Sequence, residues 1–129
     1  MFHASLVCCY LYPITQYGYP PPANDTLKHL SEMKTLGFQS VELEGIHGKH
    51  LIDMYEQRER IKEKINELEL KIPYFCTVLP GLSSADSTVR EKNLKLFQKG
   101  CEIASLLGSQ GVLDNGPLPP YQFQEDIPV

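Results

Sequence analysis

The sequence lacks several features that would place it in a familiar functional class. None of its four cysteines forms a CxxC pair, so a zinc site and a disulfide framework are both disfavoured and a reduced, cytoplasmic setting is expected. No apolar run approaches the ~20 residues that a membrane span requires. The first residues contain neither a basic segment nor a small-residue cleavage site, so we expect no secretion signal.

Two further absences concern ligands. The turn after the first expected strand contains no GxGxxG and no Walker A pattern, which disfavours nucleotide binding. Basic residues are not in excess: Lys and Arg number 12 against 16 Asp and Glu, and the net charge is -4. Such a chain has no general attraction for nucleic acid or for acidic membranes, so neither is expected as a partner.

What the sequence does contain is an ordinary globular composition with a regular alternation of elements. Its 129 residues are 42% hydrophobic and 22% charged, enough for one domain or part of one with a real core. Apolar runs and helical stripes alternate along the chain. We expect strands at residues 4–12, 38–44, 72–78 and 111–114, helices at about 25–36, 51–68 and 87–107, and a loop at 45–50.

This order, βαβαβαβ, predicts an α/β fold with a parallel sheet and the Leu, Ile and Met stripes of the helices in the core. A helix-ending Leu-Gly followed by Gln and a strand recurs at residues 36–42 and 107–113, as expected of equivalent βα units. Two architectures share this pattern, an open doubly wound sheet and a (β/α)8 barrel. A barrel needs about 250 residues, so the chain would supply half of one.

The second expected strand favours the barrel. Val41 and Leu43 point to one face of it, whereas Glu42 and Glu44 point to the other. In a parallel sheet one face meets the helices and the other meets what the sheet encloses. Carboxylates in an enclosed space are costly unless that space is a polar pocket. The alternation therefore predicts an acid-lined interior.

Glu44 and His47 are the candidate catalytic residues. Glu44 ends the strand, where barrel active sites are built, and can act as a base or bind a sugar hydroxyl, or simply reach solvent. His47 can orient substrate or ligate a metal as neutral imidazole, or lie exposed in a loop. Glu42 lies deeper and is expected in a structural hydrogen-bond network. His50 is expected at a helix start, and His3 and His29 at the surface.

Four further residues are candidates for substrate binding. Tyr12 would end the first strand as a pocket wall or pack in the core, and Cys76 would line the pocket. Asp114 and Asn115 end the fourth strand at the same mouth, although Asp-Asn-Gly is also good turn chemistry. Glu44 and His47 together are too few for a metal site, so no metal ligand is assigned.

Four segments resemble the sugar phosphate isomerase/epimerase family, the xylose-isomerase-like TIM barrels: residues 11–15 (LYPIT), 37–47 (GFQSVELEGIH), 73–77 (PYFCT) and 111–116 (GVLDNG). The resemblance implies a (β/α)8 fold that isomerises or epimerises small sugars with a divalent metal (Mn, Mg, Zn or Co) at its mouth. The family's metal ligands come mostly from later strands, so none carries over to these positions. Residues 1–129 are therefore expected to form an N-terminal half-barrel that needs a C-terminal half or a partner, binds no metal alone and is inactive alone.

The leading hypothesis is thus the N-terminal part of a metal-dependent sugar or sugar phosphate isomerase/epimerase, with a small sugar or polyol as substrate. The alternative is non-enzymatic, either a self-associating half-barrel or an α/β module that binds a small ligand. A metal-dependent endonuclease on the same fold is less favoured because the chain is acidic and has no basic stripe.

Overall fold

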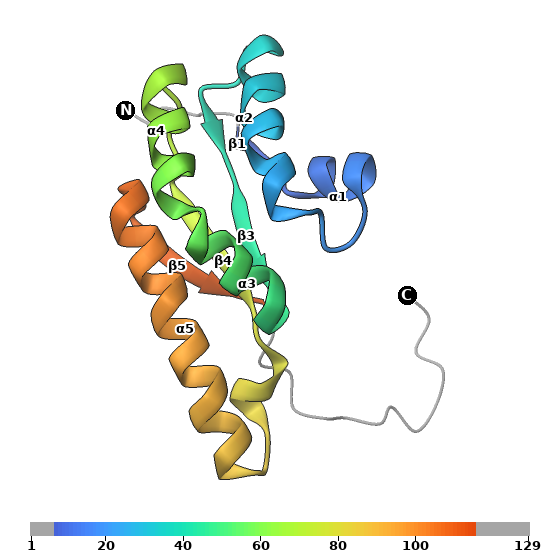
Figure 1. Ribbon diagram of the computed structural model, residues 1–129, viewed down its shortest axis with the longest axis vertical. Coiled ribbons are helices and arrows are strands. Elements are labelled where there is room, and N and C mark those ends of the chain that lie inside the picture. Colours follow the sequence, from blue (N-terminus) through green and yellow to red (C-terminus); the bar gives the residue numbers. More distant parts are fainter. Residues whose placement is uncertain (1–6, 116–129) are drawn as a thin grey trace, which may run out of the picture.

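The computed structural model describes residues 7–115, in which parallel strands are covered by helices (Figure 1). In chain order the elements are β1 (Val7–Cys8), α1 (Leu11–Tyr17), the 3-10 turn η1 (Ala23–Asp25), α2 (Thr26–Thr35), β2 (Ser40–Val41), β3 (Leu43–Ile46), α3 (His47–Glu56), α4 (Arg58–Leu68), β4 (Tyr74–Val78), the 3-10 turn η2 (Pro80–Ser83), α5 (Ser87–Leu107) and β5 (Gly111–Asp114).

All strand pairs in the described part of the chain are parallel, as the alternating pattern predicts. β1 pairs with β2, and β3, β4 and β5 form a second ladder in that order. Only Glu42 separates β2 from β3, so the spatial order runs from β1 through β2 and β3 to β4 and β5. The expected α/β class and parallel topology are confirmed.

The core lies between the strands and the helices. Val41, Leu43 and Phe75 are fully buried on the face that α3, α4 and α5 cover. The helices contribute a matching set of buried side chains: Leu30, Met33, Leu51, Met54, Ile61, Ile65, Ile103, Ala104 and Leu107. Apolar burial of this kind contributes roughly 25 cal/mol per Å² and is the main stabilising term of the fold.

Two helices end in the way the recurring Leu-Gly motif predicts. Gly37 and Gly108 adopt φ of 91° and 75°, a conformation that glycine reaches without a Cβ clash. The next residue in each case donates back into the helix, from Phe38 N to Met33 O at 3.0 Å and from Ser109 N to the carbonyl of Ala104 at 2.9 Å. The two βα units are therefore locally equivalent.

The expected first strand, residues 4–12, is wrong beyond Cys8. The described strand is Val7–Cys8, and Leu11–Tyr17 forms α1, so Tyr12 lies on a helix rather than at a strand end. Pro13 is compatible with this helix because it lies in the first turn, where its missing N–H would have no intrahelical partner.

The expected loop at 45–50 and the single helix at 51–68 are also wrong. Gly45 and Ile46 continue β3, and helix begins at His47. The helical region divides at Gln57, whose φ of -96° and ψ of 2° separate α3 from α4. No Gly or Pro marks the break, so the sequence gives no local signal for it.

Some residues of the apolar stripes lie outside the core. Leu36, Ile52, Val89 and Leu94 were expected inside but are exposed. For α5 the reason is its length. Its 21 residues rise about 31 Å, whereas the five residues of β4 span about 17 Å, so the first half of the helix extends past the sheet (Figure 1).

Within residues 7–115, no helix combines the length and apolarity needed to cross a membrane.

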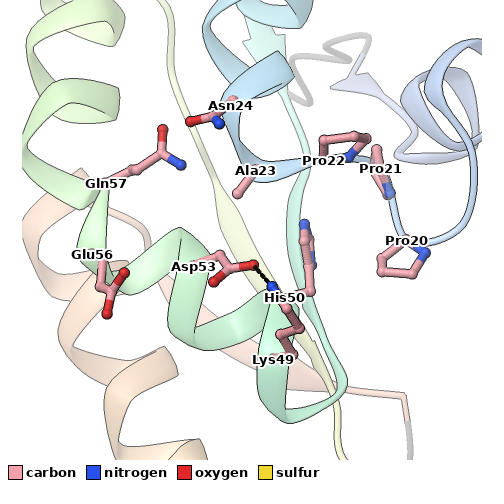
Figure 2. Close-up of a pocket in the computed structure, with 10 residues that line it drawn as sticks. All are labelled: Pro20, Pro21, Pro22, Ala23, Asn24, Lys49, His50, Asp53, Glu56 and Gln57. Carbon is pink, nitrogen blue, oxygen red and sulfur yellow. Dashed lines mark hydrogen bonds and ion pairs between the residues drawn. The ribbon is translucent and has the colours of Figure 1, made fainter.

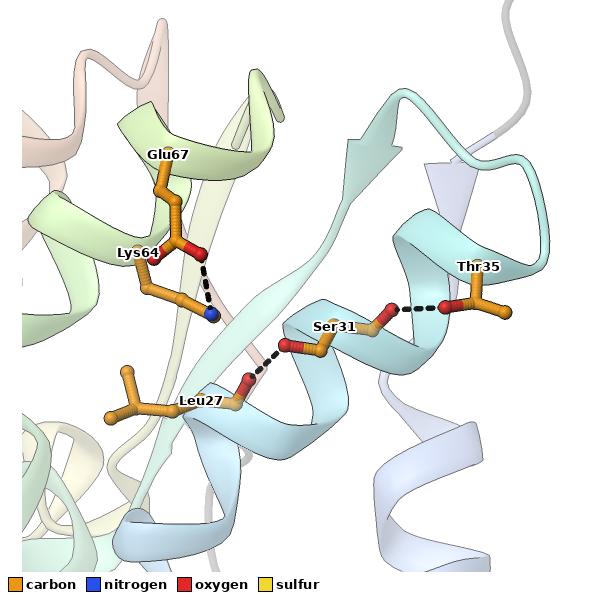
Figure 3. Close-up of polar contacts among 5 residues, drawn as sticks. All are labelled: Leu27, Ser31, Thr35, Lys64 and Glu67. Carbon is orange, nitrogen blue, oxygen red and sulfur yellow. Dashed lines mark hydrogen bonds and ion pairs between the residues drawn. The ribbon is translucent and has the colours of Figure 1, made fainter.

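Both ion pairs among the described residues are local, each within one helix. Lys49 and Asp53 form an ion pair of 2.8 Å on α3 (Figure 2), and Lys64 and Glu67 form one of 2.9 Å on α4 (Figure 3). On α2 the Ser31 hydroxyl donates to the carbonyl one turn earlier, at 3.1 Å (Figure 3). Pairs of this kind contribute at most about 1 kcal/mol, so burial decides stability.

Gly100 on α5 gives a direct test of the helix–sheet packing. A Cβ at this position would lie 2.7 Å from Thr77 Cγ2, a buried group on β4. We expect Gly100→Ala to lower the free energy of unfolding by about 1–3 kcal/mol in urea titrations. Gly48→Ala on α3 is the control, since its Cβ would meet Leu96 at 3.4 Å. Equal stability of the two variants would contradict this close approach.

Candidate functional site

Two carboxylates and one thiol meet on the face of the strands that the helices leave uncovered. Glu42 and Glu44 alternate with the buried Val41 and Leu43, so they point away from the core, as expected. The parallel register sets Glu44 beside Cys76 of β4. One ligand atom from each of Glu42, Glu44 and Cys76 lies within 4.8 Å of the others. We call these three residues the inner-face cluster.

Glu44 has the most perturbed chemistry in this cluster. Burial, together with the hydrogen bond and the negative charge of Glu42, raises its pKa to about 7. Two carboxyl groups this close cannot both ionise cheaply, so Glu44 keeps its proton up to near neutral pH. A carboxyl group that gains and loses a proton near pH 7 is suited to general acid–base catalysis.

Cys76, unlike Glu44, does not exchange a proton near neutral pH. Burial, together with the charges of Glu42 and Glu44, raises the pKa of its thiol to about 12. Its Sγ donates to Glu42 Oε1 at 3.6 Å. A thiol that stays protonated is a weak nucleophile, so Cys76 holds Glu42 in place rather than attacking substrate.

Tyr10 lies near the cluster, and sequence reasoning gave it no role. It lies two residues after the end of β1, with Cys9 between them, and its side chain is 2% exposed. Burial raises the pKa of its phenol, and the charge of Glu44 raises it too, which shows that the two groups are electrostatically coupled. The ring packs edge-on against His29 at 6.3 Å. The hydroxyl stays protonated and so is a donor.

The family that the sequence resembles uses a divalent metal, and the inner-face cluster fits such an ion in part. Carboxylates suit most divalent ions, whereas a cysteine sulfur selects Zn²⁺ or Co²⁺ over Mg²⁺ or Mn²⁺. Three protein ligands are the usual minimum for a catalytic site, and the described residues supply three. From the sequence, Glu44 and His47 alone were too few ligands for a metal site. The structure brings Glu42 and Cys76 to Glu44, whereas His47 is not in the cluster.

His47 and Tyr12 lie elsewhere than the sequence placed them. His47 is the first residue of α3, exposed, with φ of 55°, and its ring meets Tyr19 edge-on at 6.4 Å. Tyr12 is half-buried on α1 and stacks on His29 at 5.8 Å. The structure does not place either residue in the inner-face cluster.

Asp114 is the last residue of β5 and Asn115 follows it, as expected, but Asp114 faces away from the cluster. Its register partner is Thr77, which is buried on the helix-covered side, and the Thr77 hydroxyl donates to Asp114 Oδ1 at 2.6 Å. Asn115 is exposed, and its backbone N–H extends the ladder to Thr77 O at 2.8 Å. The side chain of Asp114 thus joins the packing between sheet and helices.

Two histidines are buried. His50 lies in the first turns of α3, as expected, but His29 is 1% exposed rather than at the surface, and His3 lies outside the described residues. Burial lowers the pKa of each buried ring to about 4. His50 Nδ1 accepts from the backbone N–H of Ile46 at 2.9 Å, whereas neither nitrogen of His29 bonds to a described residue. Both rings are neutral at pH 7.

The raised pKa of Cys76 predicts a large difference in thiol reactivity. At pH 8 we expect iodoacetamide to label the exposed Cys101 at least about 100-fold faster than the buried Cys76. A time course of labelling, followed by peptide mapping with mass spectrometry, measures both rates in one sample. Unfolding in urea is the control and should equalise them. Comparable rates in the folded protein would contradict the burial of the inner-face cluster.

Comparison with known proteins agrees with this architecture. The family described as xylose isomerase-like TIM barrel matches residues 30–124. The structure is similar to that of 3-keto-D-glucoside 4-epimerase YcjR from E. coli, with a TM-score of 0.57 and 22% identity over 79% of this chain. It is also similar to that of D-psicose 3-epimerase in the presence of D-fructose, with a TM-score of 0.58 and 14% identity over 79% of this chain. No curated protein sequence matches the chain.

The chain spans well under half of these two barrels. It covers 40% of the YcjR chain and 36% of the D-psicose 3-epimerase chain. The matched strands and helices thus correspond to part of a barrel, as the sequence predicted. In such a partial barrel, the face that bears Glu42, Glu44 and Cys76 is the one that would look into the closed structure.

Proposed function

Since the chain belongs to the xylose isomerase-like TIM barrel family, we propose that it supplies one wall of the active site of a sugar isomerase or epimerase. The observation that supports this most directly is the inner-face cluster, in which Glu44 has a pKa of about 7. Epimerisation or isomerisation next to a carbonyl removes a proton from carbon and returns one. A carboxyl group poised near neutral pH can remove the proton and, in isomerisation, return it to the neighbouring carbon; epimerisation needs a second group to return it from the opposite face.

The proposed substrate is a small sugar or polyol. Both solved relatives are epimerases of small sugars by name, and the proposal carries that class to this chain. Glu44 would take the proton from the carbon beside the carbonyl, and Glu42 would bear the hydrogen bond that keeps the two carboxyl groups together. Tyr10, at the N-terminal end of α1, is the nearby donor. Sugar hydroxyls both donate and accept, so they match this mixed set of groups.

A divalent metal at the inner-face cluster would be held by Glu42 and Cys76, which leaves Glu44 to move the proton, and would polarise the substrate carbonyl. Metal binding would require the Cys76 thiol to lose its proton, and the resulting thiolate would favour Zn²⁺ or Co²⁺. Further ligands would have to come from outside the described strands.

The exposed Cys101 and the buried, protonated Cys76 are compatible with a reducing cytoplasmic setting, which we also propose.

The site needs the rest of a barrel. Tyr74 and Leu113 project from the same face as Cys76 and are 44% and 48% exposed, and among the described residues β5 pairs only with β4. A closed barrel would cover these side chains and leave no free strand edge. The missing units would come from the same polypeptide or from a partner, including a second copy. A two-fold axis along the barrel would keep every strand parallel and every site at one mouth.

The function is tested by measuring epimerisation and isomerisation of ketoses in D2O with Mn²⁺, Mg²⁺, Co²⁺ or Zn²⁺. The protein is compared as residues 1–129 and as the longest reading frame that contains them. Deuterium incorporation beside the carbonyl, followed by NMR, is expected with the assembled barrel and absent or very slow with a monomer of residues 1–129. Absence of exchange on every ketose by an assembled barrel would overturn the proposal.

Light scattering on the same samples separates the enzyme from a non-enzymatic module. An active species of barrel size supports the proposed enzyme. A stable monomer that binds a ketose without exchanging its protons would favour the small-ligand module instead.

A further inference from the structure

The connection between β3 and α3 contains no loop residue. Ile46 ends the strand and His47 begins the helix. Ile46 is extended, with φ of -96° and ψ of 117°, whereas His47 has φ of 55°. A positive φ is unfavourable at a residue with a Cβ, and it persists only where neighbouring contacts hold the backbone. Glu44 lies just before this connection, so those contacts bear on the inner-face cluster.

One of these contacts is a hydrogen bond between strand and helix. The N–H of Ile46 donates to Nδ1 of His50 at 2.9 Å, and the ring points from α3 toward the end of β3 (Figure 2). Ile46 is also the N-cap of α3, so a side chain of the first turns bonds back to the N-cap N–H, as in a capping box. A backbone N–H can only donate, so Nδ1 carries no proton and the ring proton is on Nε2. His50 is 4% exposed, and burial shields the bond from water.

The second contact is close packing of the helix against the strand backbone. A Cβ on Gly45 would collide with the fully buried side chain of Leu51, whose own Cβ would lie 3.2 Å from it. The absence of a side chain at this position therefore lets α3 approach β3 closely. Two successive residues of the strand are held by α3, Gly45 by packing and Ile46 by a hydrogen bond.

The same strand end places Glu44 in the inner-face cluster. In the ladder with β4, Glu44 lies beside Cys76, and Ile46 belongs to the last pair. Without an acceptor, the buried N–H of Ile46 would cost free energy and the end of β3 would open. We infer that His50 is a positioning residue, which fixes the end of β3 and so keeps the carboxyl group of Glu44 in the inner-face cluster. The effect on catalysis rests on the proposed function, whereas the effect on the strand end does not.

Two substitutions separate the acceptor of His50 from its volume. His50→Leu fills the space but places carbon where Nδ1 lies, whereas His50→Asn is smaller but places Oδ1 there. On the full chain at pH 8, His50→Leu should raise the rate of iodoacetamide labelling of Cys76 about tenfold, because the strand end opens and uncovers the thiol. His50→Asn should change this rate less than about twofold. The exposed Cys101 is the internal control, and urea titrations correct both rates for global unfolding.

Two further measurements report on the bond and on catalysis. In the ¹⁵N-labelled wild type we expect a scalar coupling between the nitrogen of Ile46 and Nδ1 of His50, with slow exchange of the Ile46 amide hydrogen. This measurement needs no variant, so it remains decisive if His50→Leu does not fold. In the assembled barrel, His50→Leu should lower kcat about tenfold or more with KM changed less than about twofold, because a misplaced catalytic group reacts slowly. His50→Asn should retain most of kcat.

Three results would overturn the inference. One is a fast-exchanging Ile46 amide with no coupling to His50 in the wild type. Another is equal labelling of Cys76 in His50→Leu and His50→Asn after correction for global unfolding. The last is faster labelling in His50→Asn than in His50→Leu, which would assign His50 a packing role. An assembled barrel without activity on any ketose would count against the proposed function alone, since the coupling and the labelling rates test the role of His50 without it.

Discussion

Replacing Glu44 with glutamine is expected to lower kcat of the assembled barrel by about 10²–10⁴-fold, because general acid–base catalysis contributes this much. Glutamine keeps the shape of the side chain and cannot exchange a proton near pH 7, where Glu44 titrates. The measurement is the rate of deuterium incorporation into a ketose, with KM determined in parallel. A loss confined to kcat is expected, since the amide still accepts hydrogen bonds from a sugar.

Stability distinguishes this effect from unfolding. The folded state binds the Glu44 proton more tightly than the unfolded chain does, so ionisation of Glu44 destabilises the fold as the pH rises from about 4.5 to 7. Glu44→Gln removes that cost and should be at least as stable as the wild type at pH 7 or above. Glu63→Gln is the control for a distant change of charge. Full activity of Glu44→Gln would contradict the assigned role.

Acid is expected to destabilise the fold between about pH 6.5 and pH 4, by up to about 3 kcal/mol for each of His29 and His50. Burial lowers the pKa of both rings to about 4, whereas the unfolded chain binds their protons at about 6.5. The unfolded state therefore binds more protons in this window. The stabilisation is complete above pH 6.5 and is lost as the pH falls toward 4.

Urea titrations at several pH values measure this loss, and substitutions assign it. Glu44 acts in the opposite direction over an overlapping window, so the Glu44→Gln background isolates the histidines. His29→Phe keeps a ring against Tyr12 and should remove about half of the acid sensitivity. His50→Asn keeps an acceptor for the Ile46 N–H and should remove the rest. Acid sensitivity unchanged by both substitutions would show that other groups cause it.

The features that the sequence predicted correctly depend on local periodicity. The strict alternation around Leu43 determines that Glu42 and Glu44 share the face away from the core. The glycines after two helices determine where those helices end. By contrast, α4 ends with Glu69 at φ of 53°, a position where only tertiary structure supports a non-glycine residue. The division between α3 and α4 at Gln57 likewise has no local signal in the sequence.

The features that the sequence missed depend on pairing between distant segments. The offset that sets Glu44 beside Cys76 is a property of the ladder, and neither strand encodes it alone. Asp114 was expected at the mouth, but its pairing with Thr77 places it on the helix side, where a hydroxyl satisfies it. His29 had an available signal: it lies four residues before Met33 and so on the buried stripe of α2.

The most direct test of the central claim, an acid-lined inner face, is the pKa of Glu44 measured by ¹³C NMR of labelled glutamate carboxyl groups. Glu44→Gln assigns the resonance, and Glu42→Gln tests the coupling. We expect a midpoint of about 7 in the otherwise unaltered protein and a lower midpoint in Glu42→Gln. A Glu44 midpoint near the ordinary value of 4.5, unmoved by Glu42→Gln, would contradict it.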